Sequence, residues 1–303
     1  MILSICILTY KRNHLLKGLL QALLPLPAEC ELVVVDTTGK AEARELIQQT
    51  GEGNINGVFP EERQSISEGR NLALDHASGS WVMFLDDDQV ASGAQVLQVL
   101  EKIKNEGDAL HAAKLAVRPE YLSSRYENWI AKKIKRGHYF GSYSPNEQQS
   151  IPAHYLSTDG VVFRHPGSSI RFNEELGFVG GEDNDFFARY LGDKSCEVWT
   201  DIVVVDQIMP DRLSLNYIVK DSFRRGCSFA QLQGETLGFS RTRLWWCYSR
   251  DLCLSLGLFL VRFCLNQDWP LALGLVVRQY GKLRGLMGVR YALYRDGNSN
   301  IAS

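Results

Sequence analysis

The 303-residue sequence has seven cysteines but no C-x-x-C pair. Because the cysteines are odd in number and scattered, we expect neither a disulfide framework nor a zinc site. A signal peptide is not expected either, since a strand-like segment at 2–8 stands where a basic region and a cleavage site would be needed. We therefore expect a cytoplasmic protein in a reducing compartment.

Glycine-rich phosphate-binding loops are also absent. The chain contains no G-x-G-x-x-G and no G-x-x-x-x-G-K-[ST] pattern. These loops are the signatures of dinucleotide-binding and P-loop proteins, so both classes are excluded. The composition, with 45% hydrophobic and 22% charged residues, is that of an ordinary globular protein.

A long hydrophobic run is missing from the C-terminal region. The apolar segments at 252–265 and 271–277 are shorter than the roughly 20 residues that a membrane span needs, and Arg262 interrupts the first. From residue 241 onward, nine Lys/Arg accompany three Asp/Glu, whereas the first 240 residues carry 24 against 32. Basic, tryptophan-rich apolar helices favour attachment to the inner face of the cell membrane. A helical subdomain or a dimer interface is the alternative.

Three buried-type strands are predicted in the first hundred residues, at 2–8, 31–36 and 81–85. Helical patterns at 15–24, 41–49 and 67–76 lie between and before them, the last with Ser67 as its expected N-cap. This alternation predicts an α/β fold with a Rossmann-like, mostly parallel sheet flanked by helices. Between 119 and 150, mixed aromatic and basic residues predict an amphipathic helix and a loop, with a lid or acceptor surface as the alternative.

The third strand ends in three consecutive carboxylates, Asp86, Asp87 and Asp88. In open α/β sheets, ligands bind beyond the carboxyl ends of the strands. Carboxylate oxygens are the ligands that Mg²⁺ and Mn²⁺ prefer, so this stretch favours a divalent metal site. A solvated acidic turn is the alternative.

A second acidic group, Glu182, Asp183 and Asp185, follows the paired glycines Gly180 and Gly181. Paired glycines let the backbone approach a ligand closely. Acids at a helix start are also stabilised by the helix dipole, so a simple N-terminal capping cluster is the alternative.

Five stretches together resemble the family 2 inverting glycosyltransferases of the GT-A fold, in that family's order and spacing over about residues 1 to 230. They are Ile5-Cys-Ile-Leu-Thr9-Tyr10-Lys-Arg12-Asn13, Val33-Val-Val-Asp36, Ser65-Ile-Ser67-Glu-Gly69-Arg70-Asn71, Phe84-Leu-Asp86-Asp87-Asp88 and Gly180-Gly-Glu182-Asp183-Asn-Asp185-Phe. The pattern is most similar to bacterial exopolysaccharide glycosyltransferases of the succinoglycan type.

The resemblance implies a role for each matching residue. Asp88 would hold Mn²⁺ or Mg²⁺ on the donor diphosphate, and Asp86 would face the ribose, with Asp87 mainly as spacing in this D-x-D element. Asp183 would be the general base, with Glu182 and Asp185 as alternates. The remaining nucleotide-binding residues would be Thr9, Tyr10, Arg12, Asp36, Arg70 and Asp87.

One departure concerns the metal. Relatives often carry a metal-binding histidine near the segment at 203–210, where this sequence has Asp206 and Gln207. Coordination of the metal is therefore expected to rest on Asp88, the diphosphate and water.

The resemblance implies a catalytic domain at 1–211, with a nucleotide-sugar half at 1–118 and an acceptor half at 119–211, and a helical region at 212–303. The expected reaction moves a sugar from a nucleotide-sugar, a UDP-sugar, to a growing glycan carried on a polyprenyl diphosphate. Nucleic acid is not expected as a partner. The alternatives are a sugar nucleotidyltransferase, a glycosidase with two carboxylates, and a catalytically inactive relative acting as an assembly partner.

Overall fold

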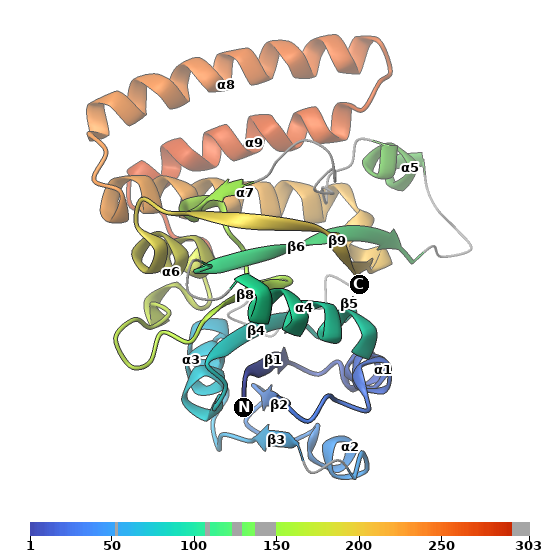
Figure 1. Ribbon diagram of the computed structural model, residues 1–303. Helices are drawn as coiled ribbons and strands as arrows, with labels where there is room; N and C mark the ends of the chain where they lie inside the picture. The colour runs from blue at the N-terminus through green and yellow to red at the C-terminus, as the bar shows by residue number, and fades with distance from the viewer. Residues whose placement is uncertain (52–53, 107–109, 123–128, 137–149, 293–303) are drawn as a thin grey trace. The chain divides into compact units, whose positions relative to one another are not determined.

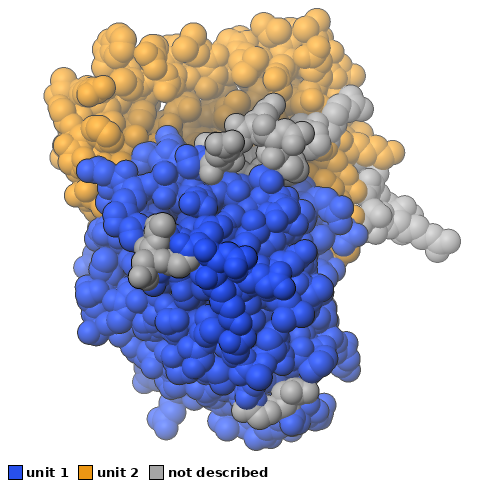
Figure 2. Space-filling view, viewed as in Figure 1, with its two compact units in different colours: residues 1–120, 142–177, 182–207 blue, residues 121–141, 178–181, 208–303 orange. Residues whose placement is uncertain are grey.

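The computed structural model describes residues 1–51, 54–106, 110–122, 129–136 and 150–292 (Figure 1). The chain divides into two compact units, coloured separately in Figure 2. Unit 1 comprises Met1–Glu120, Ser142–Gly177 and Glu182–Gln207, and unit 2 comprises Tyr121–Gly141, Phe178–Gly181 and Ile208–Ser303. The longest segment of unit 2 starts at Ile208, and two shorter segments that precede it in the sequence belong to the same unit. The domain division at residue 211 stays a prediction.

The first four strands of the nine-stranded sheet are parallel, as expected from the alternation of strands and helices. They are ordered β3-β2-β1-β4 and comprise β1 (Leu3–Thr9), β2 (Cys30–Asp36), β3 (Ile55–Val58) and β4 (Trp81–Asp86). Thr9 lies beside Asp36 in the register, and Leu8 lies beside Asp86. The ends of these strands therefore bring their polar residues to one edge of the sheet.

The rest of the sheet follows the order β8-β6-β9-β5, with β7 paired to β9. Its strands are β5 (Gln89–Val90), β6 (Ala112–Tyr121), β7 (Ser150–Pro152), β8 (Val161–Arg164) and β9 (Ser195–Ile208). β8 is antiparallel to both β4 and β6, and β9 is antiparallel to both β5 and β7. The α/β class is confirmed, but parallel pairing is limited to the first half. Apolar runs alone do not reveal strand direction.

Helices cover both faces of the sheet and enclose two apolar cores. α1 (Asn13–Leu23), α2 (Arg44–Gln48) and α4 (Gly93–Glu106) contribute to one core, and α3 (Ile66–His76) and α6 (Glu182–Leu191) contribute to the other. In α1 the buried residues are Leu16, Leu19, Leu20 and Leu23, which is the spacing of one helical face. Two short 3₁₀ helices, η2 (Ala153–Tyr155) and η3 (Glu174–Leu176), lie in the connections.

The N-cap of α3 differs from the sequence prediction. Ser65 caps the helix, and its side chain accepts a hydrogen bond from the backbone N–H of Glu68, while the Glu68 carboxylate accepts one from the N–H of Ser65. This reciprocal capping box satisfies two backbone donors at once. Ser67 lies inside the first turn instead, so its prediction as the cap is wrong.

Unit 2 is mainly helical. It contains α5 (Trp129–Arg136), η4 (Pro210–Leu213), α7 (Leu215–Gln231), the π-helical turn η5 (Leu232–Thr236), α8 (Arg241–Cys264) and α9 (Trp269–Leu286). α7 and α9 pack at glycines, because a Cβ built on Gly226 would stand 2.2 Å from the Arg278 carbonyl oxygen and one on Gly281 would stand 2.5 Å from that of Phe223. The helix predicted between 119 and 150 is present as α5, whereas 123–128 and 137–149 lie outside the described residues.

α8 is longer than the apolar segment seen in the sequence. It has 24 residues, and among the described residues it is the one helix long and apolar enough to cross a membrane by length and composition alone. Only 11% of its most apolar window is buried. The helix is longer because the tryptophan- and arginine-containing stretch before residue 252 continues the same helix.

Candidate active site

Asp36 ends β2 with both carboxylate oxygens engaged in its own loop. One oxygen accepts hydrogen bonds from the N–H and the hydroxyl of Thr38 at 2.9 and 2.6 Å, and the other accepts one from the N–H of Ala43 at 2.8 Å. Asp36 is 1% exposed. The structure therefore shows it shaping the loop after β2, and its predicted contact with a base stays a prediction.

At the end of β4, Asp87 and Asp88 are held by residues from the end of β1. Thr9 donates its hydroxyl to Asp87 at 2.9 Å, and the Arg12 guanidinium binds Asp87 at 3.2 Å and Asp88 at 3.1 Å. Burial raises the pKa of Asp87, and the Arg12 charge offsets part of that rise. Asp87 is thus an anchor in this fold and not merely spacing.

Tyr10, which lies between Thr9 and Arg12 in the sequence, has two cations beside its ring. The ammonium of Lys11 lies 5.1 Å from the ring centroid, and the guanidinium carbon of Arg63 lies 5.0 Å from it. Such contacts place positive charge beside the end of β1.

Asp86 is surrounded by like charges. Burial, followed by the carboxylates of Asp88, Asp159 and Asp206, raises its pKa well above the ordinary value. Asp206 pairs with Gln89 across β5 and β9, and the N–H of Gln207 binds the Asp88 carbonyl at 3.0 Å. The segment expected to replace the histidine-bearing one of relatives therefore lies directly beside the triple acid.

This concentration of carboxylates fits a hard divalent cation, which would reduce their mutual repulsion. Among the residues that the structure describes, no group of three or more His, Cys, Asp or Glu side chains is arranged to hold a metal ion. A cation bound by one or two carboxylates and by substrate phosphates does not require such a cage. The residues present are consistent with the predicted Mn²⁺ or Mg²⁺.

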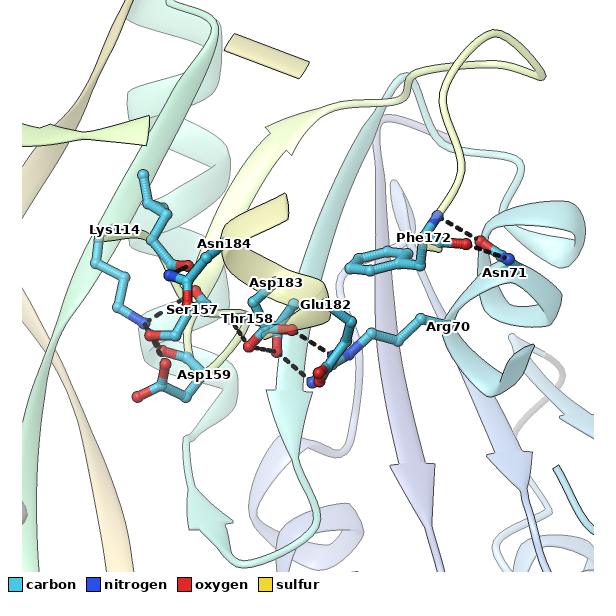
Figure 3. A network of polar contacts seen from close by, with 11 residues as sticks. Arg70, Asn71, Lys114, Ser157, Thr158, Asp159, Phe172, Glu182, Asp183 and Asn184 are labelled. Atoms are coloured by element: carbon cyan, nitrogen blue, oxygen red, sulfur yellow. Dashed lines mark hydrogen bonds and ion pairs between the residues drawn. The ribbon is translucent and has the colours of Figure 1, made fainter. Parts of the chain in front are cut away.

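The second acidic group is gathered by Arg70, which projects from α3 (Figure 3). Its guanidinium donates to Glu182 and to the Thr158 hydroxyl, each at 2.6 Å, and to Asp183. The glycines before α6 have φ angles of 90° for Gly180 and 93° for Gly181, a region that L side chains rarely adopt. We predicted Arg70 near the nucleotide, and the structure places it against the acidic pair, although its charge also acts on Asp86.

Asp183 has the electrostatics of a base that works near neutral pH. Burial raises its pKa to about 7, since the lowering by Arg70 is opposed by the negative charge of Glu182. Its Oδ2 accepts hydrogen bonds from the N–H and the hydroxyl of Thr158, both at 3.3 Å. Beside it, Glu182 is 6% exposed and its Oε2 has no hydrogen-bond partner. A buried acceptor without a partner is costly, so this oxygen is suited to a hydroxyl brought by a ligand.

Asp185 is engaged elsewhere. Its carboxylate accepts from Arg189, one turn further along α6, at 2.6 Å. Arg189 also donates to the carbonyl of Arg171. This ion pair makes Asp185 less available than Asp183 as a base, and its role as an alternate stays a prediction.

Sequence reasoning assigned no role to three residues that support the two acidic groups. Gln89 fixes the turn after β4 by accepting from the N–H of Asp86 at 3.1 Å. Thr158 binds Asp183, and the Asp159 carboxylate acts on both Asp86 and Asp183. The available signal was Ser157-Thr158-Asp159-Gly160, a polar run directly before a strand.

The arrangement as a whole places a set of carboxylates suited to a metal in one unit with a separate carboxylate suited to proton transfer. Asp86 and Asp183 are both within electrostatic reach of Arg70 and of Asp159. Of these two acidic sites, the one after β4 could hold a cation that stabilises a leaving anion, and the one at the start of α6 could accept a proton from a nucleophile.

Comparison with known proteins gives a consistent answer. The family model "Glycosyl transferase family 2" matches residues 4–166. The "Succinoglycan biosynthesis protein ExoM" of Rhizobium meliloti is 28% identical over 254 residues, covering 77% of this chain and 75% of that protein. An "Uncharacterized glycosyltransferase" of Haemophilus influenzae is 30% identical over 116 residues, covering 37% of this chain and 39% of that protein.

Among solved structures, S. aureus TarS 1–349 in complex with UDP-GlcNAc superposes with a TM-score of 0.54 at 16% identity, over 96% of this chain and 93% of that one. A longer S. aureus TarS structure gives 0.51 at 19% identity, over 81% of this chain, which spans 45% of that one. At these identities the likeness establishes the fold. Because the family model covers more than half of the chain, the protein belongs to glycosyl transferase family 2 and is a glycosyltransferase of the GT-A fold.

Proposed function

We propose that the protein transfers a sugar from a UDP-sugar, with inversion, to a growing cell-surface glycan. The observation that carries this proposal is the half-buried Asp183, which is held by Arg70 and Thr158 apart from the carboxylates after β4 and whose pKa is raised to about 7. Two similar proteins support the substrate classes, since TarS was solved with UDP-GlcNAc and ExoM is a succinoglycan biosynthesis protein. Membership of the family argues against the sugar nucleotidyltransferase alternative.

In the donor half, Asp88 would hold Mn²⁺ or Mg²⁺ and Asp86 would face the ribose. When bound, the cation would stabilise the negative charge of the leaving nucleoside diphosphate. Arg12 bridges Asp87 and Asp88 and is one-third exposed, so its guanidinium is positioned to turn toward a diphosphate that enters. The other donor-binding residues in this proposal are Thr9, Tyr10, Asp36, Arg70 and Asp87.

In the acceptor half, Asp183 would take the proton of the acceptor hydroxyl. The hydroxyl oxygen forms a bond to the sugar C1, and the bond from C1 to the diphosphate oxygen breaks with its electron pair leaving on the diphosphate. The unpartnered Oε2 of Glu182 would orient the acceptor by accepting a hydrogen bond from a second hydroxyl of the acceptor sugar, which leaves the reacting hydroxyl to donate to Asp183. A base opposite the leaving group leads to a single displacement with inversion.

The acceptor in this proposal is a polyprenyl-diphosphate-linked glycan, and α8 would hold the enzyme at the membrane surface. α8 exposes a large apolar face, in which Trp246 is 67% and Leu254 is 66% exposed. Within the same helix, the Arg250 guanidinium lies over the Trp246 ring. Apolar faces with basic and tryptophan-bearing ends bind at the interface of anionic bilayers. Co-sedimentation of the full chain with anionic vesicles, and its loss in Trp246→Glu/Leu254→Glu, would support this; a chain that never sediments with them would contradict it.

A thermal-shift panel of nucleotide-sugars with and without Mn²⁺ tests the donor proposal, because a bound ligand stabilises the fold by mass action. We expect UDP-sugars to raise the Tm more in the presence of Mn²⁺. Asp88→Ala should remove the Mn²⁺-dependent part of the rise, whereas Asp75→Asn, at an exposed pair with Arg171, should preserve it. An equal UDP response in Asp88→Ala would contradict the metal role.

A further inference from the structure

Lys114 is a fully buried cation that none of the roles above includes. It lies on β6, opposite Val161 of β8, with 0% of its side chain exposed (Figure 3). A buried ammonium is tolerated only when its hydrogen bonds and its charge are compensated. The groups that compensate Lys114 therefore indicate what it does.

Within the described part of the chain, the hydrogen bonds of the Lys114 ammonium go to the two residues that flank Thr158. It donates to the carbonyl and the hydroxyl of Ser157, both at 3.3 Å, and to the Asp159 carboxylate at 2.7 Å, as well as to the Asp159 carbonyl. The cation thus binds the backbone on both sides of Thr158.

Thr158 in turn contacts the acceptor-side carboxylate. Its N–H and hydroxyl donate to Asp183 Oδ2, and its hydroxyl oxygen accepts from Arg70. The two ends of this loop are fixed by other bonds, from Asn184 to the Leu156 carbonyl at 3.0 Å and from the N–H of Gly160 to the Phe84 carbonyl at 3.0 Å. Lys114 holds the residues on either side of Thr158, between these two ends.

Lys114 also supplies the counter-charge for Asp159. Burial would raise the pKa of Asp159, but the Lys114 ammonium and its hydrogen bonds hold it below the ordinary value, so the carboxylate is charged. That charge acts on both Asp86 and Asp183. Without Lys114, Asp183 would face an uncompensated neighbour.

We propose that Lys114 is a positioning residue for Asp183, which it serves by aligning the Thr158 donors on Oδ2 and by neutralising Asp159. Its importance for turnover rests on the proposed function, in which Asp183 is the base. Lys114 itself touches no reacting atom in this scheme.

The expected consequence follows from the groups that face Asp183. These are Arg70 from α3, Glu182 from its own helix, and Thr158 and Asp159 from the loop. Loss of Lys114 weakens the Thr158 hydrogen bonds and exposes Asp183 to the Asp159 charge. Both changes disfavour the carboxylate form, so both raise the pKa of Asp183.

The test is a ¹³C NMR titration of the aspartate carboxyl carbons in the full chain, with the Asp183 signal assigned by its loss in Asp183→Asn. We expect Lys114→Met to move the Asp183 midpoint upward by about one pH unit. Lys114→Met/Asp159→Asn, which also removes the uncompensated charge, should reverse part of that shift. Lys102→Met, which removes a lysine paired with Asp201 outside this network, is the matched control and should leave the midpoint in place.

An unchanged Asp183 midpoint in a folded Lys114→Met would overturn the proposal. If that variant does not fold, Thr158→Val provides the test, because it keeps Lys114 and removes the hydroxyl donor to Asp183; an unmoved midpoint there would equally overturn it. The titration needs no substrate. A chain that transfers no sugar from any donor therefore contradicts the proposed function, while the NMR result alone decides the role of Lys114.

Discussion

The two acidic groups of the site are built alike but differ in how firmly they are held. In each, one arginine bridges two carboxylates: Arg12 binds Asp87 and Asp88, and Arg70 binds Glu182 and Asp183. The Arg12 side chain is 33% exposed, whereas that of Arg70 is 9% exposed and also binds Thr158. The Arg12 contacts are 3.1 and 3.2 Å long, while Arg70 approaches Glu182 to 2.6 Å.

This difference matches the chemistry proposed for each group. A donor site that admits a cation and a diphosphate needs an arginine that can exchange partners, so Arg12, which is one-third exposed, is suitable. A proton acceptor needs a fixed orientation and a tuned pKa, and a buried arginine with three polar partners provides both. We therefore infer that the donor half adapts to its ligand and that the acceptor half is preorganised.

The largest effect is expected from Asp183→Asn, which keeps the shape of the side chain and removes the base. Transfer should fall by roughly 10²- to 10⁴-fold, the usual contribution of general-base catalysis. The response of the Tm to UDP and Mn²⁺ should remain, because the donor residues are intact. Retained turnover in this variant, together with its loss in Glu182→Gln, would move the base to Glu182. Asp75→Asn serves as the control for a change of aspartate outside the site.

Unequal stability losses are expected when the two bridging arginines are removed. Arg70→Met leaves two largely buried carboxylates without their cation and should lower the free energy of unfolding by about 3–5 kcal/mol. Arg12→Met also leaves two buried carboxylates, Asp87 and Asp88, without their cation, but Arg12 itself is one-third exposed and its contacts are longer, so a smaller loss of about 1–3 kcal/mol is expected. Urea unfolding of both variants at neutral pH measures the difference. Equal losses would show that the acceptor half is held no more firmly than the donor half.

The smallest effect concerns the cap of the helix that carries Arg70. Ser65→Ala should reduce the free energy of unfolding by about 1 kcal/mol, because it removes one half of the capping box. Ser67→Ala is a matched control: its buried hydroxyl has no hydrogen-bond partner, so its removal should cost little or stabilise the fold. If both changes cost the same, the cap contributes nothing specific to the placement of Arg70.

The sequence predicted the parts of the site that repeat a local pattern. Apolar runs ending in Asp36 and Asp86 located the strand ends, and the glycine pair located the start of α6 with its acids. It did not predict that Arg70 would reach Asp183, because a contact between residues 113 positions apart leaves no local pattern. Lys114 was missed for the same reason, since one lysine in a predicted strand gives no sign of the loop it binds. The antiparallel half of the sheet was missed because apolar strands look alike in either direction.

The most direct test of the central claim is the pH dependence of kcat for sugar transfer, measured with a donor identified in the nucleotide-sugar panel. A carboxylic acid whose pKa is raised to about 7 keeps its proton below that pH and is then unable to accept another. The same shift makes folding stability decline as pH rises from the ordinary carboxyl pKa to about 7, since the unfolded chain releases this proton first. If Asp183 is the base, kcat should rise with pH to a plateau with a midpoint near pH 7, and the residual rate of Asp183→Asn should lose that limb. A kcat that is flat from pH 5 to 8 in the wild-type protein, or an unchanged midpoint in Asp183→Asn, would contradict the account.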